Sequence, residues 1–267
     1  MKQVIFITGA SSGIGKAIAG LLASKGYLVY GTSRKPHQEE QGYHLIPMDI
    51  SNDLSVNQAI DVVIGKEGRI DVLINNVGVG IGGAIESFTQ EEASYQMDVN
   101  FTGMTRVTRA VLPHMRQQRS GRIINISSIG GLIGLPFQGF YSASKFAIEG
   151  FSEALAMEVR PWNIRVVVVN PGDFKTGFTA CRQVTKKDQS GSDYQSAANK
   201  AIDIMGRDEQ SGCNPVLLAT AMYKIIRKKK PKYRYIIGRF DQRLIARIRH
   251  LLPPGLVRRI ISSHYGI

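Results

Sequence analysis

Tyr141 and Lys145 are the residues of this chain whose types and spacing most directly indicate chemistry. On a helix, side chains four residues apart project from the same face, so the phenol and the ammonium would lie side by side. A tyrosine titrates at about 10, and a neighbouring positive charge lowers that pKa by stabilising the phenolate. Such a phenol exchanges protons efficiently near neutral pH. We therefore predict that Tyr141 gives a proton to a carbonyl oxygen, or takes one from an alcohol, with Lys145 tuning its pKa.

Two serines, Ser127 and Ser128, precede the tyrosine by 14 and 13 residues. A hydroxyl held beside the phenol would hydrogen-bond the oxygen of the substrate and stabilise the charge that develops there. From the residues alone, either serine fits this role. The five histidines and the two cysteines follow no metal-ligand spacing, so we expect no metal. The phenol and the hydroxyl already supply the electrophilic assistance that a zinc ion gives elsewhere.

An apolar run at residues 4–8 leads into a glycine-rich turn, Thr-Gly-Ala-Ser-Ser-Gly-Ile-Gly at 8–15. Glycines there let the backbone turn sharply and approach a phosphate, and the helix that follows offers free N–H groups and the positive end of its dipole. The three residues between the first two glycines depart from the more common G-x-G-x-x-G spacing. The turn predicts a site for the pyrophosphate of a dinucleotide, formed by Gly9, Ser11, Ser12, Gly13, Ile14 and Gly15.

Short apolar runs alternate with helical patterns over the first 170 residues, which predicts a parallel sheet covered by helices on both faces. With 43% hydrophobic residues, a chain of 267 residues can bury a sizeable core. We expect an α/β fold, a Rossmann-type doubly wound parallel sheet in a single domain with a C-terminal helical extension. The expected strands are 4–8, 28–33, 43–48, 71–75, 122–126, 164–170 and 233–237, and the expected helices are 13–25, 53–66, 91–117 with a break near Asn100, 141–159, 195–205 and 215–228.

The turn at 8–15 has the pattern Thr-Gly-x-x-x-Gly-x-Gly, and further short motifs follow it in order. The order and the separations of these motifs make the chain resemble the short-chain dehydrogenase/reductase superfamily along nearly all of its first 180 residues. The valine at position 77 departs from the alanine that is usual there. The motifs are Asn75-Asn76-Val77-Gly78 after the fourth strand, Asn100 in a long helix, Ser127 and Ser128 after the fifth strand, Tyr141-Ser142-Ala143-Ser144-Lys145, and Pro171-Gly172 with Thr176 after the sixth strand.

The resemblance implies a role for each matching residue. Ser128 rather than Ser127 would hydrogen-bond the substrate oxygen, and Tyr141 would be the proton donor and acceptor. Lys145 would also hold the nicotinamide ribose, and Asn100 would anchor a water that relays protons to Lys145. The remaining cofactor contacts would come from Asp49 at the adenine amino group, Ile50 beside the adenine ring, Asn76 at the adenosine ribose, Thr176 at the carboxamide, and Gly78, Pro171 and Gly172.

The end of the second strand indicates which nicotinamide is used. Enzymes of this fold that prefer NAD usually place an acidic residue there, where it binds the ribose hydroxyls. Here that position is Ser33, and Arg34 and Lys35 follow it. A guanidinium pairs with a 2′-phosphate, whereas a carboxylate would repel it. We therefore predict NADP(H) as the cofactor; the alternative is a basic pair that is only solvated in a loop.

The substrate is expected to bind beside the catalytic serine and tyrosine. Residues 131–137, Gly-Leu-Ile-Gly-Leu-Pro-Phe, would either line the pocket or pack in the core, and residues 177–212 form a long polar insertion that we expect to be a flexible lid. The stretch 130–158 and the basic C-terminus resemble most the 17β-hydroxysteroid dehydrogenase and retinol dehydrogenase-like branch. That resemblance implies a hydrophobic ketone, aldehyde or alcohol, such as a steroid, a retinoid or a fatty-acyl derivative.

The positive charge is concentrated at the end of the chain. Residues 224–267 contain 13 lysines and arginines and one acidic residue, and the net charge of the whole chain is +13. We divide the chain into a dehydrogenase domain, 1–238, and a basic amphipathic extension, 239–267. A helix at 240–252 would place Phe240, Leu244, Ile248 and Leu251 on one face and Arg239, Arg243, Arg247 and His250 on the other.

This extension has two main interpretations. Its helix would either attach the protein to an anionic membrane surface, or cap the substrate pocket with the apolar face while the arginines stay in water. Nucleic-acid binding is not expected, because only Tyr233 and Tyr235 interleave with the basic residues and no nucleic-acid-binding module is present.

The remaining expectations concern location, assembly and class. No export signal and no apolar stretch of about 18 residues is found, so we expect a cytoplasmic protein with at most a peripheral membrane contact. Relatives pair through the helices that correspond to 91–117 and 141–160, so a homodimer or homotetramer is expected. A different class is a non-catalytic regulatory protein that senses NADPH. The intact set of Ser128, Tyr141 and Lys145 argues against it.

Overall fold

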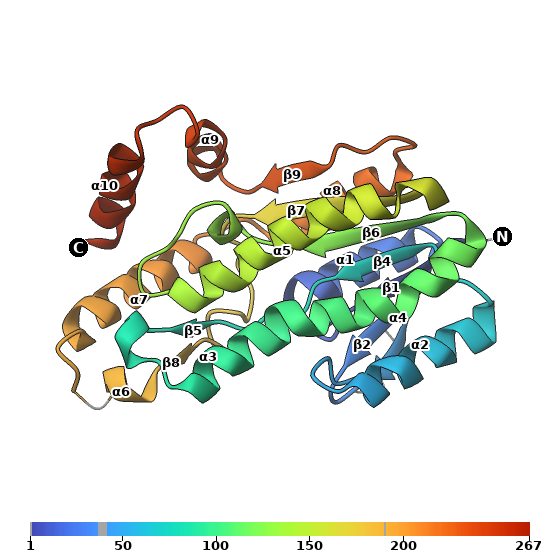
Figure 1. Ribbon diagram of the computed structural model, residues 1–267, viewed down its shortest axis with the longest axis horizontal. Helices are drawn as coiled ribbons and strands as arrows, with labels where there is room; N and C mark the ends of the chain where they lie inside the picture. Colours follow the sequence, from blue (N-terminus) through green and yellow to red (C-terminus); the bar gives the residue numbers. More distant parts are fainter. Residues whose placement is uncertain (1, 37–41, 190) are drawn as a thin grey trace.

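The computed structural model describes residues 2–36, 42–189 and 191–267. Seven parallel strands form one sheet in the order β3-β2-β1-β4-β6-β7-β9 (Figure 1). This is the doubly wound sheet that the alternation of strands and helices predicts, and each of the seven expected strands is present. The strands are β1 (Val4–Ile7), β2 (Leu28–Ser33), β3 (His44–Pro47), β4 (Val72–Asn75), β6 (Gly121–Ile126), β7 (Ile164–Pro171) and β9 (Arg234–Ile237).

The strand order reverses at the middle of the sheet, where β1 pairs with β2 on one side and with β4 on the other. The chain builds one half of the sheet outward from β1 and then returns to build the other half. In such sheets a crevice opens at this reversal, outside the carboxyl ends of the strands. The residues predicted for cofactor binding and catalysis follow these ends.

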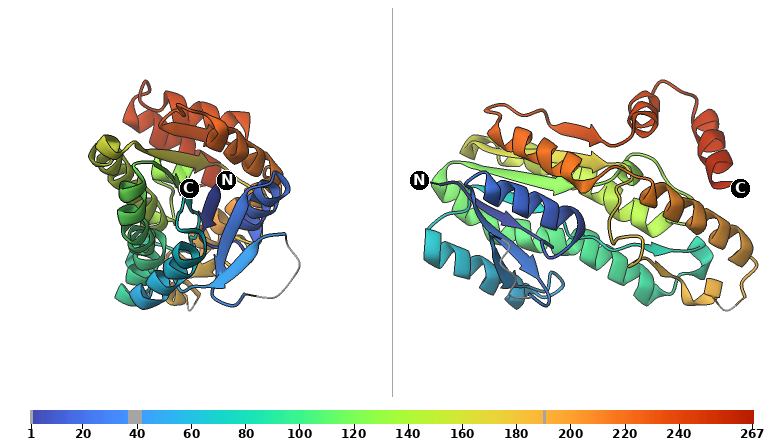
Figure 2. Two further views of the ribbon diagram at one scale, coloured as in Figure 1. Left: turned by 90° about the vertical axis from the view of Figure 1, so that its right-hand side faces the viewer. Right: turned by 180° about the vertical axis from the view of Figure 1, so that it is seen from behind.

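Helices cover both faces of the sheet, as the views in Figure 2 show. Two helices pack on one face and three on the other, and all five were expected from the sequence. The first pair is α1 (Gly13–Ser24) and α8 (Pro215–Arg227); the others are α2 (Asp53–Glu67), α4 (Gly103–Gln118) and α5 (Gly139–Glu158).

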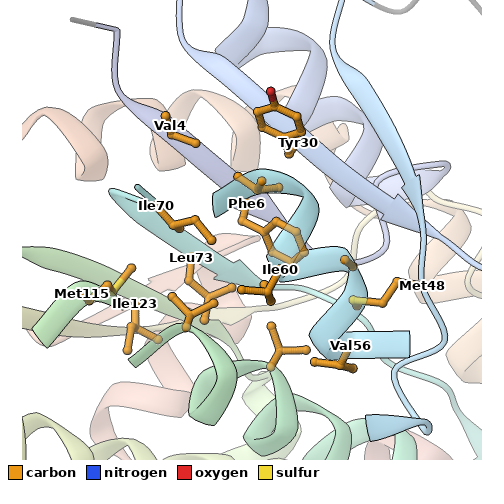
Figure 3. Packing of buried hydrophobic residues seen from close by; sticks show 14 of the residues in the cluster. Val4, Phe6, Tyr30, Met48, Val56, Ile60, Ile70, Leu73, Met115 and Ile123 are labelled. Carbon is orange, nitrogen blue, oxygen red and sulfur yellow. The ribbon is translucent and has the colours of Figure 1, made fainter. Parts of the chain in front are cut away.

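The two faces of the sheet give two apolar cores. Phe6 and Leu73 point toward α2 and α4, as Figure 3 shows, whereas Ile5 and Ile74 point toward α1 and α8. Successive residues of a strand face opposite sides, so a strand buried on both sides is apolar throughout. The unbroken apolar runs in the sequence are explained by this double burial.

The helix expected at 91–117 is present but is not one regular α-helix. α3 (Gln90–Met97) and α4 are joined by a π-helical turn, Asp98–Thr102. Asn100 lies in this turn and is 0% exposed. A π turn accommodates an extra residue and is frequent at functional sites. The predicted break near Asn100 is thus a local widening of a continuous helix.

Residues 177–212, the expected lid, fold largely into regular elements. The helix expected at 195–205 is confirmed and extends to residue 210, and a short strand of this segment pairs with another after β4. The mobility of the lid stays a prediction. The helix at 195–210 is α7 (Gln195–Gln210). The elements before the C-terminal extension that were not predicted from the sequence are β5 (Ile81–Gly82), β8 (Gln183–Val184), α6 (Lys186–Gln189), and the short turns Ile85–Ser87, Ile129–Gly131 and Arg160–Trp162.

The C-terminal extension forms two helices, α9 (Phe240–Ile248) and α10 (Pro254–Tyr265), which follow β9 at the top left of Figure 1. The second helix was not predicted, because Pro253 and Pro254 end the amphipathic pattern that precedes them. Proline at the first helical position is compatible with starting a new helix. Within the described residues, no helix is both long enough and apolar enough to cross a bilayer.

The predicted apolar face of the extension does not cap the pocket. Phe240, Leu244 and Leu251 are 75%, 43% and 83% exposed. Instead, α9 faces the domain with Ile245 and Ala246. The face with Phe240, Leu244 and Leu251 therefore does not cap the pocket, and the capping interpretation is wrong for that face. The extension packs on the domain with the side of α9 that carries Ile245 and Ala246.

A buried chain of amides and hydroxyls joins the sheet to α4 and α5. The Asn75 amide donates to Asn125 Oδ1 at 2.9 Å and to Thr108 Oγ1 at 3.1 Å, and the Asn125 amide donates to Ser152 Oγ at 2.8 Å. All four side chains are buried. Buried polar groups destabilise a fold unless they are paired, so this chain fixes the position of both helices on β4 and β6.

We expect Asn125→Ala to lower the free energy of unfolding by about 2–4 kcal/mol, because it leaves a cavity and unpaired groups on Asn75 and Ser152. Equilibrium unfolding in urea measures this change. The matched control is Asn57→Ala at an exposed position of α2, for which we expect a change within about 0.5 kcal/mol. Equal stabilities of the two variants would contradict the role of the network.

Candidate active site

A pocket of about 1150 Å³ lies at the carboxyl ends of the parallel strands. All residues predicted for catalysis or cofactor binding line it except Gly15 and Asn100, which lie behind its wall. The structure thus gathers motifs that are far apart in the sequence. The predicted residues at the wall are Gly9, Ser11, Ser12, Gly13, Ile14, Ser33, Arg34, Asp49, Ile50, Asn76, Gly78, Ser128, Tyr141, Lys145, Pro171, Gly172 and Thr176.

The turn between β1 and α1 is shaped by its glycines. Gly9 and Gly13 have φ angles of +70° and +54°, which side chains disfavour. At Gly15, a Cβ would lie 2.0 Å from the Gly9 carbonyl oxygen, so only glycine lets the helix begin here. The N-cap, Ser12, makes no side-chain cap bond, and the first turn of α1 has no acidic residue. Its free N–H groups therefore fit the pyrophosphate of a dinucleotide.

Basic residues mark the adenosine end of the pocket. Ser33 ends β2, and Arg34 and Lys35 follow it on the pocket wall. Both cationic side chains therefore face the pocket, and their contact with a phosphate on the adenosine ribose stays a prediction. Asp49 lines the same pocket after β3 and accepts the N–H of Ser51 at 2.9 Å.

Asn76, expected at the adenosine ribose, lines the pocket but also has a structural task. Its side-chain nitrogen donates to the carbonyl oxygens of Thr8 and Gly9, both at 3.0 Å. These bonds brace the glycine turn against the loop after β4. The two loops that flank the crevice are therefore held together by this amide.

Ser128, Tyr141 and Lys145 come together although they lie on separate elements. Ser128 follows β6, and the other two lie one turn apart in the first half of α5. Lys145 Nζ is 5.7 Å from the centre of the Tyr141 ring and donates to the Ile126 carbonyl oxygen at 3.1 Å. The Ser128 hydroxyl is hydrogen-bonded with the phenol, whereas the buried Ser127 hydroxyl donates to the Lys145 carbonyl oxygen at 3.4 Å. The geometry favours Ser128 as the residue that meets the substrate.

The expected lowering of the Tyr141 pKa is wrong in this structure. Burial of the phenol raises its pKa, and the hydrogen bond with Ser128 opposes that rise only in part. Lys145 does not reverse the effect, because its ammonium is directed at the Ile126 carbonyl and is itself destabilised. Burial lowers the pKa of Lys145 to about 8, against the attraction of Glu149. The phenol is therefore protonated at neutral pH, which is the state that donates a proton.

Asn100 is held in the π-helical turn by the loop after β4. Its Oδ1 accepts the N–H of Val79 at 2.7 Å, and its Nδ2 donates to the Val79 carbonyl oxygen and to Ser144 Oγ, both at 3.0 Å. A Cβ at Gly78 would lie 3.5 Å from both Asn100 Oδ1 and Lys145 Nζ. The amide and the ammonium thus approach each other beside this glycine. The water relay between them stays a prediction.

Two residues that were not predicted from the sequence hold Ser128, the predicted catalytic serine, in place. Asn170, near the end of β7, donates its amide to the Ser128 carbonyl oxygen at 2.9 Å and to Glu149 Oε1 at 2.6 Å. Glu149, in α5, also accepts from Arg234 of β9 at 2.7 Å. This set links the loop after β6 to the catalytic helix. The available signals were a polar residue in an otherwise apolar strand and a glutamate on the buried face of a helix.

The substrate end of the pocket has apolar walls. In the segment 131–137, Ile133 and Leu135 line the pocket while Leu132 packs against Ala246, so each of the two interpretations holds for part of the segment. The segment 177–212 also contributes to the wall, and the C-terminal extension contributes through Ile245, Ile260 and Ile261 rather than through its predicted face. The apolar lining residues are Ile129, Ile133, Leu135, Phe174, Phe178, Met205, Ile245, Ile260 and Ile261.

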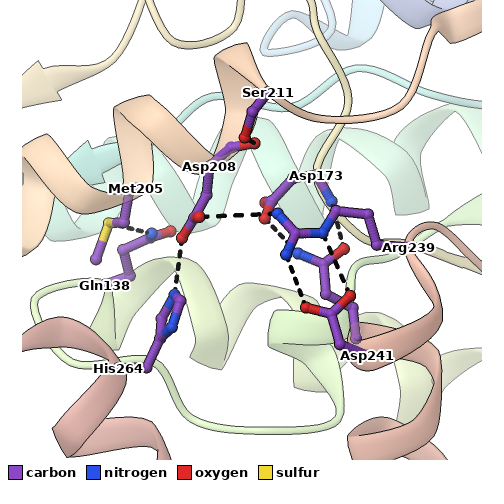
Figure 4. A network of polar contacts seen from close by, with 9 residues as sticks. Gln138, Asp173, Met205, Asp208, Ser211, Arg239, Asp241 and His264 are labelled. Carbon is purple, nitrogen blue, oxygen red and sulfur yellow. Dashed lines mark hydrogen bonds and ion pairs between the residues drawn. The ribbon is translucent and has the colours of Figure 1, made fainter.

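A charged network fastens the extension across this end of the pocket (Figure 4). His264 Nε2 of α10 lies 2.7 Å from the Asp208 carboxylate of α7, and Arg239 lies 4.0 Å from the same carboxylate. Arg239 also pairs with Asp241 at 2.9 Å.

In the part of the chain that the structure describes, no three His, Cys, Asp or Glu side chains gather as metal ligands.

Comparisons with known proteins agree with this geometry. The family model for short chain dehydrogenase matches residues 3–187. The 3-ketodihydrosphingosine reductase of Bacteroides thetaiotaomicron is 48% identical over 265 residues, which cover 99% of this chain and 98% of that protein. Human retinol dehydrogenase 8 is 33% identical over 258 residues, 87% of this chain and 80% of that protein.

Among solved structures, a short-chain dehydrogenase from Streptomyces avermitilis superposes with a TM-score of 0.83 at 30% identity, covering 98% of this chain and 96% of that chain. The resemblance drawn from the motifs is confirmed, and a retinol dehydrogenase is among the relatives, although the sphingolipid reductase is more similar. A nicotinamide cofactor follows from the match and fits the glycine turn. The chain belongs to the short-chain dehydrogenase family and is an enzyme that acts on CH–OH or C=O groups.

Proposed function

We propose that this protein reduces a hydrophobic ketone to a secondary alcohol with NADPH. The observation that carries the proposal is the continuity of the pocket. One cavity joins the uncapped N-terminus of α1, the phenol of Tyr141 and an apolar wall. Its first part fits a dinucleotide, and its last part fits a long apolar ketone.

The bound cofactor supplies the hydride that reduces the carbonyl carbon. Ser128 Oγ and Tyr141 Oη hold the carbonyl oxygen and polarise it. Because burial keeps the phenol protonated, Tyr141 donates its proton to this oxygen as negative charge develops there. Lys145, whose pKa is about 8, lies beside the phenol and returns a proton to it. Asn100 anchors the water that relays protons to Lys145.

The substrate class that we favour is a long-chain ketone of the sphingoid type. The support is the 48% identity over 99% of the chain with a 3-ketodihydrosphingosine reductase, together with the apolar wall. A steroid or a retinoid has weaker support, which is the 33% identity with a retinol dehydrogenase. A non-catalytic NADPH sensor is disfavoured, because Ser128, Tyr141 and Lys145 assemble in one pocket.

We expect Tyr141→Phe to lower kcat by about 100- to 10,000-fold, since the variant keeps the ring but loses the proton that is transferred. Oxidation of NADPH is followed with 3-ketodihydrosphingosine, steroid, retinoid and simple aldehyde substrates. Tyr223→Phe, on α8 and away from the pocket, is the matched control with unchanged activity. Full activity of Tyr141→Phe would refute the mechanism.

The preference for NADPH rests on the residues after β2. Ser33, Arg34 and Lys35 line the pocket there, and a guanidinium binds a phosphate through paired hydrogen bonds. A neutral serine in place of an acidic residue removes the repulsion that an NAD-specific site would exert on the 2′-phosphate. The two cofactors differ only in this phosphate, so these residues would determine the choice between them.

For Arg34→Ala we expect the dissociation constant for NADPH to rise by about 10- to 100-fold, the loss of one charge-assisted contact, while that for NADH changes little. Fluorescence titration of the protein with each cofactor measures both constants. Arg160→Ala, an exposed arginine in the turn after α5, serves as the control. Equal weakening of both cofactors, or of neither, would show that Arg34 does not bind the 2′-phosphate.

We also propose a homodimer or homotetramer that forms through α4 and α5. Phe146 and Met157 of α5 are exposed apolar side chains. They lie on the helix through which members of the superfamily pair. Burial of such side chains against a second copy would stabilise an assembly.

We propose in addition that the enzyme is cytoplasmic and binds anionic membrane surfaces through α9 and α10. Phe240 and Leu251 are exposed, and Arg247, Arg258 and Arg259 are exposed on the same segment. Exposed apolar side chains interspersed with basic ones are typical of interfacial helices. Because other side chains of these helices line the pocket, a lipid-like substrate would pass directly between the bilayer and the site.

In vesicle sedimentation, we expect binding to equimolar phosphatidylcholine and phosphatidylglycerol but not to phosphatidylcholine alone, with binding weakened by salt. The double variant Phe240→Ser/Leu251→Ser should bind about 10-fold more weakly, because two apolar contacts are lost. Val216→Ser/Leu217→Ser, exposed apolar residues of α8, is the control. Unchanged binding of the first variant would exclude α9 from the membrane contact.

A further inference from the structure

Asp173 differs from the other carboxylates of the substrate pocket. Four acidic residues line that end of the pocket, on a chain whose net charge is +13. Among the described residues, each of the other three lies in an ion pair, and Asp173 does not. The pairs are Glu209 with Arg182, and both Asp208 and Asp241 with Arg239.

The immediate partner of Asp173 is a neutral amide. Gln242 of α9 donates its side-chain N–H to the Asp173 carboxylate and accepts the Asp173 backbone N–H at 3.1 Å. Arg239 is nearby in Figure 4, but its guanidinium is engaged by Asp241 and Asp208. Burial raises the pKa of Asp173 to about 6. The attraction of Arg239 opposes this rise only in part, because no cation of the described residues pairs directly with the carboxylate. A largely buried carboxylate without a direct ion pair is destabilising unless a ligand supplies a cation.

Asp173 also lies close to the reacting groups. It follows Gly172 directly after β7, the strand whose Asn170 holds Ser128. Its negative charge contributes to the raised pKa of Tyr141. Asp173 and the phenol line the same pocket, so a substrate whose carbonyl oxygen meets the phenol shares its cavity with this carboxylate.

We infer that Asp173 binds a cationic amino group carried by the substrate next to the carbonyl that is reduced. The inference rests on the proposed function, since a sphingoid 3-ketone carries a primary ammonium on the carbon beside its ketone. The ammonium forms a charge-assisted hydrogen bond with the carboxylate and supplies the missing counter-charge. Asp173 then determines specificity, selecting amino ketones over plain long-chain ketones, while the chemistry stays with Tyr141.

A purely structural role for Asp173 would be to fasten α9 through Gln242. The variant Asp173→Asn separates the two roles. Its amide oxygen still accepts the Gln242 N–H, so the contact with α9 is kept, and only the negative charge is lost. Asp203→Asn, at an exposed position of α7, removes the same charge outside the pocket and is the matched control.

The test compares kcat/KM for 3-ketodihydrosphingosine with kcat/KM for the ketone of equal chain length that lacks the amino group. For wild type we expect the amino ketone to be preferred. In Asp173→Asn, the ratio of the two values should fall by about 10- to 100-fold, mainly through KM of the amino ketone, as expected for one hydrogen bond to a charged group. Asp203→Asn should keep the wild-type ratio.

A second measurement uses the unaltered enzyme and does not depend on how the variant folds. A long-chain primary amine should inhibit ketone reduction more strongly than the alcohol of equal length, and Asp173→Asn should lose this difference. Equal inhibition of wild type by the amine and the alcohol, or an unchanged substrate ratio in Asp173→Asn, overturns the inference alone. If wild type reduces neither ketone, the proposed function fails, and the inference falls with it.

Discussion

The parallel pairing of β1, β4, β6 and β7 is the constraint on which the site depends. Because these strands run in one direction, the residues that follow them meet at one edge of the sheet. Gly9 follows β1, Asn76 follows β4, Ser128 follows β6 and Gly172 follows β7. The catalytic helix α5 then has to be fixed against this edge, which buried hydrogen bonds from Asn125 and Asn170 accomplish. A rigid sheet thus positions the serine, and polar contacts in its core position the tyrosine relative to it.

Burial then decides the protonation states of the catalytic pair. A low-dielectric wall disfavours charge on both groups, so the pKa of Tyr141 rises and that of Lys145 falls to about 8. The two shifts move the two pKa values apart and leave the ammonium more acidic than the phenol. A proton lost from the phenol would therefore be replaced from the ammonium in a favourable direction. This order of acidity supports the proposed reductive mechanism, in which the phenol is the donor and the lysine is its source.

The parts of the site that the sequence predicts are those encoded by neighbouring residues. The glycine turn and the Tyr141–Lys145 spacing each lie within one turn or one helix, and each is in the expected place. Contacts between distant segments could not be predicted in this way. One example is the hydrogen bond that Asp188 accepts from the N–H of Ala84 at 2.8 Å, across 104 residues. A second is the apolar face of 240–252, because periodicity identifies such a face without indicating whether it packs on protein or faces solvent. The sign of the Tyr141 pKa shift also depended on burial, which spacing does not show.

The C-terminal extension and the substrate pocket beside it carry charges of opposite sign. The extension presents exposed arginines, while the substrate end of the pocket holds four carboxylates. A cationic lipid in free solution would be repelled by the arginines, although screening limits this repulsion to roughly 8 Å at physiological salt. If the protein binds an anionic bilayer as proposed, the ammonium of such a lipid is already neutralised by its neighbours there, and the arginines would bind the same anionic lipids. Transfer into the pocket would then exchange those anionic headgroups for the carboxylate of Asp173, so the ammonium would have a counter-charge both in the bilayer and in the pocket.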